Sequence, residues 1–259
     1  MHSPYLFELT RMVMKDKHSF YAWEDIEQVR EQMLKDDRVI EFVDYGIGGK
    51  KNGECGLDFR ELRRVRDIAQ TSLTQKKYAQ LLARIVLWEM RNEKGGLRNV
   101  GTYGGLNIVE LGTSLGITTA YLASVDSRNK VVTYEGCEAV ADIAKQNWRL
   151  LGLNNIECRV MEIGNEAMMG EGDERKLDLV FIDANHTYTH TREYFNIGVS
   201  MAHDKTIIVI DDIHHSPEME RAWKDICEDE RVTSTIDLYQ MGLVFFDPHY
   251  WHRNYKIRL

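Results

Sequence analysis

Short apolar runs alternate with longer segments of helical periodicity from about residue 107 onward. Five of these runs predict buried strands, at residues 108–111, 131–134, 156–161, 177–183 and 206–212. Between and after them, three segments have the composition of helices, at residues 118–125, 138–151 and 217–227. Strands that alternate with helices indicate an α/β fold with a mostly parallel, doubly wound sheet covered on both faces.

The end of the predicted sheet has a different pattern. The runs STIDLYQ and GLVFFD, at residues 234–240 and 242–247, follow one another with no helix between them. They predict an antiparallel hairpin. The fold class is therefore a Rossmann-like sheet, mostly parallel, that closes with a C-terminal antiparallel hairpin.

The first hundred residues have a mainly helical pattern. Four helices are expected, at residues 5–14, at residues 23–35, on a face marked by Leu62, Val65 and Ile68, and at residues 75–92 with Thr74 as N-cap. We therefore expect a helical N-terminal extension at residues 1–100 and the main domain at residues 101–259. The extension could cap a site, form a homodimer interface or extend the core.

One segment of this extension has a sequence similar to that of a nucleotide-binding turn. Residues 39–49, VIEFVDYGIGG, contain closely spaced glycines. The KKNGECG that follows is charged rather than helical, and no strand ending in an acid comes at the required distance. We expect a strand or extended segment followed by a loop.

Residues 107–136 carry the clearest ligand-binding pattern. A strand leads into the glycine turn at residues 112–116, a helix follows, and a second strand stops at Glu135. This order is one mononucleotide-binding half of a doubly wound sheet. Ser114 stands where a dinucleotide-binding turn has its second glycine, so a ligand with adenosine but no pyrophosphate suits the turn better. Glu135 would accept hydrogen bonds from the ribose hydroxyls.

Composition limits the classes of partner. A formal net charge of −8 without a Lys/Arg block argues against nucleic acid. The four cysteines have no C-x-x-C spacing and are expected to be reduced thiols of a cytoplasmic protein. Charges interrupt the apolar run at the N-terminus, so we expect neither a signal peptide nor a membrane span.

Acidic and histidine side chains follow the predicted fourth and fifth strands. Asp183, Asp211 and Asp212 would meet at the carboxyl edge of the sheet, where carboxylates repel one another unless a proton or a cation intervenes. Hard oxygen ligands favour Mg²⁺ or a similar divalent cation. The alternative is that these acids only cap helices and orient loops. His186 and, failing it, His214 are candidate general bases.

Four motifs, in this order and spacing, resemble class I S-adenosylmethionine-dependent methyltransferases: IVELGTSLGITTAYLA, TYEG, DLVFIDANHTY and IIVIDDIHHSPEMERAW. They are similar to the O-methyltransferases related to the catechol and macrocin enzymes, and more closely to a bacterial branch of that family. The resemblance covers residues 107–250. The sheet with its closing hairpin is the methyltransferase variation of the doubly wound fold.

The resemblance implies roles for individual residues. S-adenosylmethionine would be bound by Glu110, Gly112, Thr113, Ser114, Gly116, Glu135, Gly136, Gly164, Asn165 and Asp183. The metal ligands would be Asp183, Asp211 and Asp212. His186 occupies the position of the catalytic lysine in catechol-type enzymes, and Asn185 the position of an acid in macrocin-type enzymes.

The sequence thus predicts methyl transfer from S-adenosylmethionine to a hydroxyl of a small-molecule acceptor, assisted by a divalent cation. Two alternatives stay open: a metal-independent methyltransferase with another acceptor, and a non-catalytic S-adenosylmethionine-binding module. A nicotinamide oxidoreductase is disfavoured by Ser114.

Overall fold

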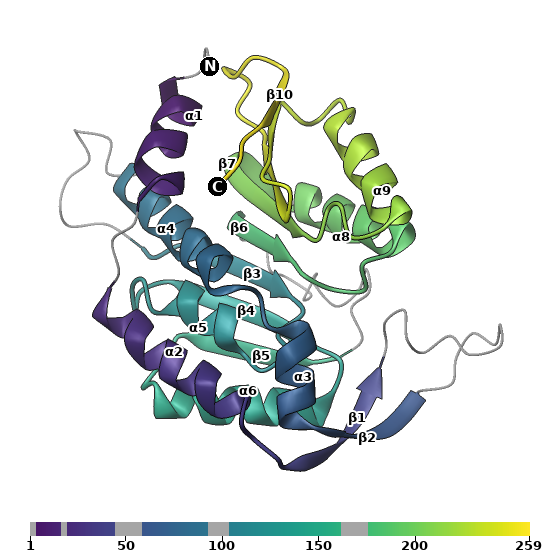
Figure 1. Ribbon diagram of the computed structural model, residues 1–259. Helices are drawn as coiled ribbons and strands as arrows, with labels where there is room; N and C mark the ends of the chain where they lie inside the picture. The colour runs from purple at the N-terminus through teal and green to yellow at the C-terminus, as the bar shows by residue number, and fades with distance from the viewer. Residues whose placement is uncertain (1–3, 17–19, 45–58, 93–103, 162–175) are drawn as a thin grey trace.

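A computed structural model describes residues 4–16, 20–44, 59–92, 104–161 and 176–259 (Figure 1). Within these residues, eight strands form one sheet in the order β10-β8-β9-β7-β6-β3-β4-β5. The strands are β3 Asn107–Leu111, β4 Lys130–Glu135, β5 Ile156–Val160, β6 Leu177–Ile182, β7 Ala202–Asp211, β8 Ser234–Asp237, β9 Met241–Phe245 and β10 Arg253–Lys256. The five strands from β3 to β7 are those expected from the apolar runs.

The pairing confirms a mostly parallel sheet with an antiparallel hairpin. Strand β3 pairs in parallel with β4 and β6, β4 with β5, and β6 with β7. Strands β8 and β9 form the hairpin, and β9 lies antiparallel beside β7. This pairing brings the turn of the hairpin to the carboxyl end of β7, where Asp211 is opposite Met241. The edge strand β10, parallel to β8, has no counterpart among the predicted strands.

Both faces of the sheet are buried, which explains why its strands have continuous apolar sequences. In β7, Ile207 and Val209 belong to one hydrophobic cluster, whereas Ile208 and Ile210 belong to the cluster on the opposite face. Side chains alternate between the faces of a strand. A strand covered on both sides therefore needs an apolar residue at every position.

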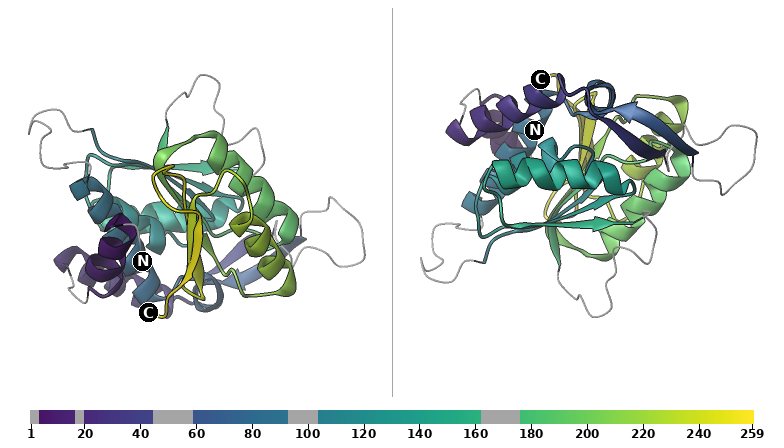
Figure 2. Two further views of the ribbon diagram at one scale, coloured as in Figure 1. Left: turned by 90° about the horizontal axis from the view of Figure 1, so that it is seen from above. Right: turned by 90° about the horizontal axis from the view of Figure 1, so that it is seen from below.

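Helices from the two halves of the chain cover opposite faces of the sheet (Figures 1 and 2). The helices are α4 Lys76–Asn92, α5 Ile117–Ala123 and α6 Glu138–Leu150 on one side, and α8 Tyr188–Ser200 and α9 Pro217–Cys227 on the other. Helix α9 begins where sequence predicts, because the Ser216 hydroxyl accepts a hydrogen bond from the Met219 N–H and Pro217 occupies the first turn.

The N-terminal region is less helical than expected. Its elements are α1 Pro4–Leu9, a π-helical turn Thr10–Met14, α2 Tyr21–Met33, β1 Val39–Asp44, β2 Phe59–Arg64 and α3 Val65–Ser72. Strands β1 and β2 form a separate antiparallel pair beside α3 and α6 (Figure 1). The strand expected at residue 39 is confirmed, and the loop expected after it falls at residues outside the described ranges.

Two details of the helical prediction are wrong. Leu62 belongs to strand β2 and is 77% exposed, because β2 pairs with β1 and successive side chains of a strand point to opposite faces. The third helix of the N-terminal region, α3, begins only at Val65. Helix α4 begins at Lys76, and the Thr74 hydroxyl is hydrogen-bonded to Asp183 and Thr118 rather than serving as the immediate cap.

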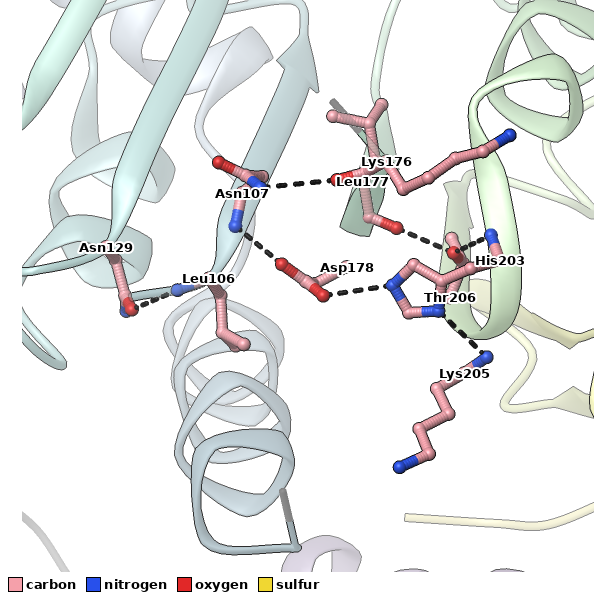
Figure 3. Close-up of polar contacts among 9 residues, drawn as sticks. All are labelled: Leu106, Asn107, Asn129, Lys176, Leu177, Asp178, His203, Lys205 and Thr206. Atoms are coloured by element: carbon pink, nitrogen blue, oxygen red, sulfur yellow. Dashed lines mark hydrogen bonds and ion pairs between the residues drawn. The ribbon is translucent and has the colours of Figure 1, made fainter. Parts of the chain in front are cut away.

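Polar side chains fix the amino ends of the central strands (Figure 3). The Asp178 carboxylate accepts a hydrogen bond from the Asn107 backbone N–H at 2.6 Å and lies 3.0 Å from His203 Nε2. The Lys205 N–H donates to His203 Nδ1, so the proton of the neutral ring is on Nε2 and points to Asp178. The Thr206 hydroxyl donates to the Leu177 carbonyl. This network joins β3, β6 and β7 at the edge opposite the candidate site.

None of the helices in the described ranges is long and apolar enough to cross a membrane. Cys137, Cys158 and Cys227, the cysteines of the described part of the chain, have free thiols.

Candidate functional site

A cavity of about 590 Å³ lies at the carboxyl ends of the central strands. Parallel α/β sheets bind ligands at this edge. The cavity brings together eight of the residues predicted from sequence: Gly112, Ser114, Glu135, Gly136, Asp183, His186, Asp211 and Asp212. Of the other predicted residues, Gly164 and Asn165 lie outside the described ranges.

The glycine turn requires glycine for two separate reasons. Gly112 has φ of +98°, and a Cβ atom there would lie 2.0 Å from the Asp183 carbonyl oxygen. Gly116 has φ of +76°, and its Cβ would collide with the indole of Trp148, which donates a 2.8 Å hydrogen bond to the Gly116 carbonyl. Side chains are therefore excluded from both ends of the turn.

Glu135 fixes the turn from the neighbouring strand. Its carboxylate accepts hydrogen bonds from the backbone N–H groups of Ser114 at 2.9 Å and Cys137 at 3.0 Å. Burial raises the pKa of Glu135, and these hydrogen bonds oppose that increase. The carboxylate still lines the cavity, so a ligand that binds there meets an acceptor already oriented by the backbone.

Glu110 in β3 and Thr113 and Gly116 in the turn itself do not line the cavity. The Glu110 side chain is fully buried and accepts hydrogen bonds from the hydroxyls of Thr119 and Thr133. Its other oxygen has no partner in the described structure. Burial raises the pKa of Glu110 from 4.5 to about 8. The cofactor contacts assigned to these three residues stay predictions.

Asp183 and His186 form a pair inside the cavity. His186 Nε2 lies 3.4 Å from Asp183 Oδ1, and the Thr74 hydroxyl donates to Asp183 Oδ2 at 3.3 Å. Burial lowers the pKa of His186, but the hydrogen bond and charge of Asp183, together with the charges of Asp212 and Asp211, raise it above its ordinary value. The arrangement is that of a carboxylate-oriented imidazole.

Asp211 and Asp212 occupy the end of β7 and have different surroundings. Asp211 is 5% exposed, and its Oδ1 has no hydrogen-bond partner in the described structure. Burial and the charges of Asp183 and Asp212 raise the pKa of Asp211 well above its ordinary value. Asp212 accepts a hydrogen bond from the Gln240 side-chain amide.

The predicted metal ligands are not assembled as a ligand set. The described residues include no group of three or more His, Cys, Asp or Glu side chains arranged to hold a metal ion. Asp183 is hydrogen-bonded to Thr74 and paired with His186, and Asp212 is hydrogen-bonded to Gln240. As they lie, these side chains do not fit a bound ion.

The second candidate base, His214, lies outside the residues that line the cavity. Its Nε2 is 3.0 Å from Asp237 and its Nδ1 is 3.4 Å from Glu220. The ring also stacks on Tyr239, with centroids 5.4 Å apart. Both ring nitrogens face carboxylates, so His214 joins α9 to the hairpin, and of the two histidines it is His186 that lies in the cavity.

Unusual backbone conformations concentrate at this edge of the sheet. Four non-glycine residues with positive φ line the cavity: Ser114, Asn185, His186 and Asp212. Each such conformation costs about 1–3 kcal/mol and persists where the surrounding structure imposes it, often at functional sites. The strain therefore marks the cavity independently of its residue types.

Several lining residues were not identified from sequence. Gln240 comes from the β8–β9 turn, and Phe42, Arg63, Ser72 and Thr74 come from the N-terminal region. The Ser72 and Ser114 hydroxyl oxygens lie 2.6 Å apart, so the N-terminal region contacts the glycine turn directly. Of these residues, only Gln240 could have been found from the sequence. It lies in the turn of the predicted hairpin, and a hairpin strand antiparallel to the fifth strand begins at the carboxyl end of that strand.

Comparison with known proteins agrees with this geometry. Residues 109–213 match a family described as a methyltransferase domain. The O-methyltransferase imqG of Aspergillus flavus is 28% identical over 117 residues, which cover 42% of this chain and 47% of that protein. The chain thus spans about half the length of this relative.

Solved structures share the fold over most of the chain. An O-methyltransferase from Bacillus cereus in complex with SAH has a TM-score of 0.57 at 18% identity, covering 93% of this chain and 97% of its own. The SAH-bound methyltransferase PaMTH1 of Podospora anserina has a TM-score of 0.59 at 12% identity, covering 95% and 97%. Residues 109–213 thus match a methyltransferase domain, and the chain shares its fold with solved methyltransferases.

Proposed function

We propose that the protein transfers the methyl group of S-adenosylmethionine to a hydroxyl of a small molecule. The observation that carries the proposal is that one cavity contains both the glycine turn with Glu135 and the Asp183–His186 pair. The glycine turn with Glu135 suits an adenosine-containing cofactor, and the Asp183–His186 pair suits a general base. The volume of about 590 Å³ is within the range of small-molecule sites.

In this proposal the cofactor lies across the turn. Its ribose hydroxyls donate to Glu135, and its methionine part reaches Asp183. The acceptor oxygen attacks the methyl carbon in line with the carbon–sulfur bond, that bond breaks, and its electron pair remains on sulfur, which leaves S-adenosylhomocysteine. Holding the two reactants in line can lower the barrier by about 7–11 kcal/mol.

His186 accepts the proton of the acceptor hydroxyl. In its neutral form the Nε2 proton is directed to Asp183, so Nδ1 is the nitrogen that accepts. Asp183 then stabilises the imidazolium by its charge. Thr74 fixes the other oxygen of Asp183, and through it the N-terminal region positions the base. We propose this positioning as the contribution of residues 1–100 to the domain at residues 101–259.

The reaction as proposed contains no metal step. The expected divalent cation would require Asp183 or Asp212 to exchange its present partner for the ion. The acids at the end of β7 therefore need a role other than binding this ion.

Two measurements test the proposal. Titration calorimetry with S-adenosylmethionine tests the cofactor, and formation of S-adenosylhomocysteine with a panel of hydroxylated acceptors tests transfer. His186→Gln should lower the turnover number by about 10²–10⁴-fold and leave cofactor affinity unchanged. His249→Gln is the matched control, since His249 has a 90% exposed side chain and does not line the cavity.

Cofactor binding without transfer to any acceptor would make the protein a non-catalytic binding module. Wild-type turnover in His186→Gln would remove the histidine from the mechanism and leave the cofactor assignment standing.

A further inference from the structure

Carboxylates line the cavity at the ends of β6 and β7. Across the sheet the order is β4-β3-β6-β7, with Glu135 ending β4, Asp183 following β6 and Asp211 ending β7. Neighbouring strands lie about 4.8 Å apart, so β7 is roughly 14 Å along this edge from β4. A cofactor bound at the turn therefore leaves the Asp211–Asp212 end of the cavity for the acceptor.

One oxygen at this end has no hydrogen-bond partner. Asp211 lines the cavity, is only 5% exposed, and its Oδ1 is unpaired within the described structure. A buried acceptor atom left unpaired costs free energy. The site therefore favours a ligand that brings a hydrogen-bond donor to this oxygen.

Among the described residues, no lysine or arginine neutralises this end of the cavity. Arg63 is the only lysine or arginine among the described lining residues, and it pairs with Glu61 and lies 4.5 Å from the centre of the Phe42 ring. In the described residues neither Asp211 nor Asp212 forms an ion pair. His186 adds a positive charge only when it is protonated, and its partner is Asp183, so Asp211 and Asp212 keep no permanent counter-charge among the described residues.

The cofactor does not provide a lasting counter-charge either. Its sulfonium is positive before transfer and becomes a neutral thioether afterwards. A positive group on the acceptor would keep its charge through the whole reaction. A neutral hydroxyl would supply the missing donor to Asp211 but not the charge that Asp212 faces.

We propose that the acceptor is a hydroxylated amine whose protonated amino group is bound by Asp211 and Asp212. An N–H of the ammonium donates to Asp211 Oδ1, and Asp212 supplies the second negative charge. The inference rests on the proposed function and names the acceptor class for that reaction.

Three probes with one ring and different charges test the inference. Dopamine, hydroxytyrosol and homoprotocatechuate share a catechol ring and carry an ammonium, an alcohol and a carboxylate. Calorimetry measures their binding to the protein saturated with S-adenosylhomocysteine, so turnover is not needed. Dopamine should bind at least about tenfold more tightly than hydroxytyrosol, as expected for hydrogen bonds to a charged partner, and homoprotocatechuate should bind most weakly.

Two variants locate the effect. Asp211→Asn and Asp212→Asn should each reduce the preference for dopamine over hydroxytyrosol about tenfold. Asparagine tolerates the φ of +55° at position 212 and keeps an oxygen for Gln240. The matched control is Asp142→Asn on α6, which removes the same charge from an exposed ion pair with Lys145 outside the cavity.

The outcomes separate this inference from the proposed function. The amine proposal is overturned if the three probes bind equally or if the carboxylate probe binds best. It is also overturned if the preference for dopamine is unchanged in both variants, or if dopamine does not bind at about 10 mM. It is also overturned if Mg²⁺ must be present for hydroxytyrosol to bind and abolishes the dopamine preference, because the bound cation is then a metal ion. If S-adenosylhomocysteine does not bind, the proposed function fails, and the probes still report on the free protein.

Discussion

Glu110 offers a prediction whose size follows from its surroundings. Its carboxyl is fully buried beneath the glycine turn, and burial raises its pKa from 4.5 to about 8. A folded-state pKa above the unfolded value means that unfolding releases a proton between these limits, so this group's contribution to stability falls as pH rises from 4.5 toward 8. At pH 7, about 2.5 pH units above the unfolded value, the cost is about 3 kcal/mol, at 1.36 kcal/mol per unit.

Glu110→Gln removes this titration and keeps the shape of the side chain. The amide oxygen can accept from the hydroxyls of Thr119 and Thr133, and the NH₂ group takes the place of the oxygen that has no partner. The free energy of unfolding is measured by urea denaturation at pH 5 and pH 7. Relative to wild type, the variant should gain about 2–3 kcal/mol between these two values.

The variant and the wild type share all other titrating groups, so the contributions of those groups to the pH dependence of stability cancel in the comparison. Glu157→Gln is the control, because Glu157 is mostly exposed and pairs with Arg159 at the surface. A stability difference between Glu110→Gln and wild type that is the same at pH 5 and pH 7 would refute the reasoning. It would mean that the buried carboxyl keeps its charge.

Three further predictions concern the cofactor, the turn and the metal. Glu135→Ala should weaken S-adenosylmethionine binding by about 1–3 kcal/mol in calorimetry, and unchanged affinity would contradict the role given to this residue. Gly112→Ala should lower the free energy of unfolding by more than about 2 kcal/mol, because its Cβ would meet the Asp183 carbonyl. Gly152→Ala, with φ of +68° and open space around the Cβ, should cost less; equal losses would show that the contact has no effect. Methyl transfer should persist in excess EDTA, as measured by S-adenosylhomocysteine formation, and loss of activity that Mg²⁺ restores would reinstate the aspartates as metal ligands.

The central sheet could be predicted because its signals are local. An apolar run long enough for one strand, followed by a helical period and a glycine turn, is recorded in consecutive residues such as 107–136. The acids at strand ends were found for the same reason, since parallel strands deliver their carboxyl ends to one edge. Helix α9 was placed correctly because serine and proline mark its beginning.

The elements that were missed depend on partners distant in sequence. Strand β2 is charged, FRELRR, and becomes a strand through pairing with β1 across residues outside the described ranges. His186 and His214 each follow an aspartate closely in sequence. Only the fold turns His214 toward carboxylates of α9 and the hairpin and His186 into the cavity. The close approach of the Asp183 backbone to Gly112 likewise depends on a partner distant in sequence.

The contacts of Ser72 with Ser114 and of Thr74 with Asp183 have a consequence for how relatives of this protein diverge. The family match spans residues 109–213, whereas Phe42, Arg63, Ser72 and Thr74 all precede it. The glycine turn and part of the cavity lining are thus encoded in separate stretches of the chain. Substitutions before residue 76 can therefore reshape this part of the cavity while the glycine turn and the strand ends keep their sequence, so proteins grouped by the shared segment are free to differ in the shape of the cavity.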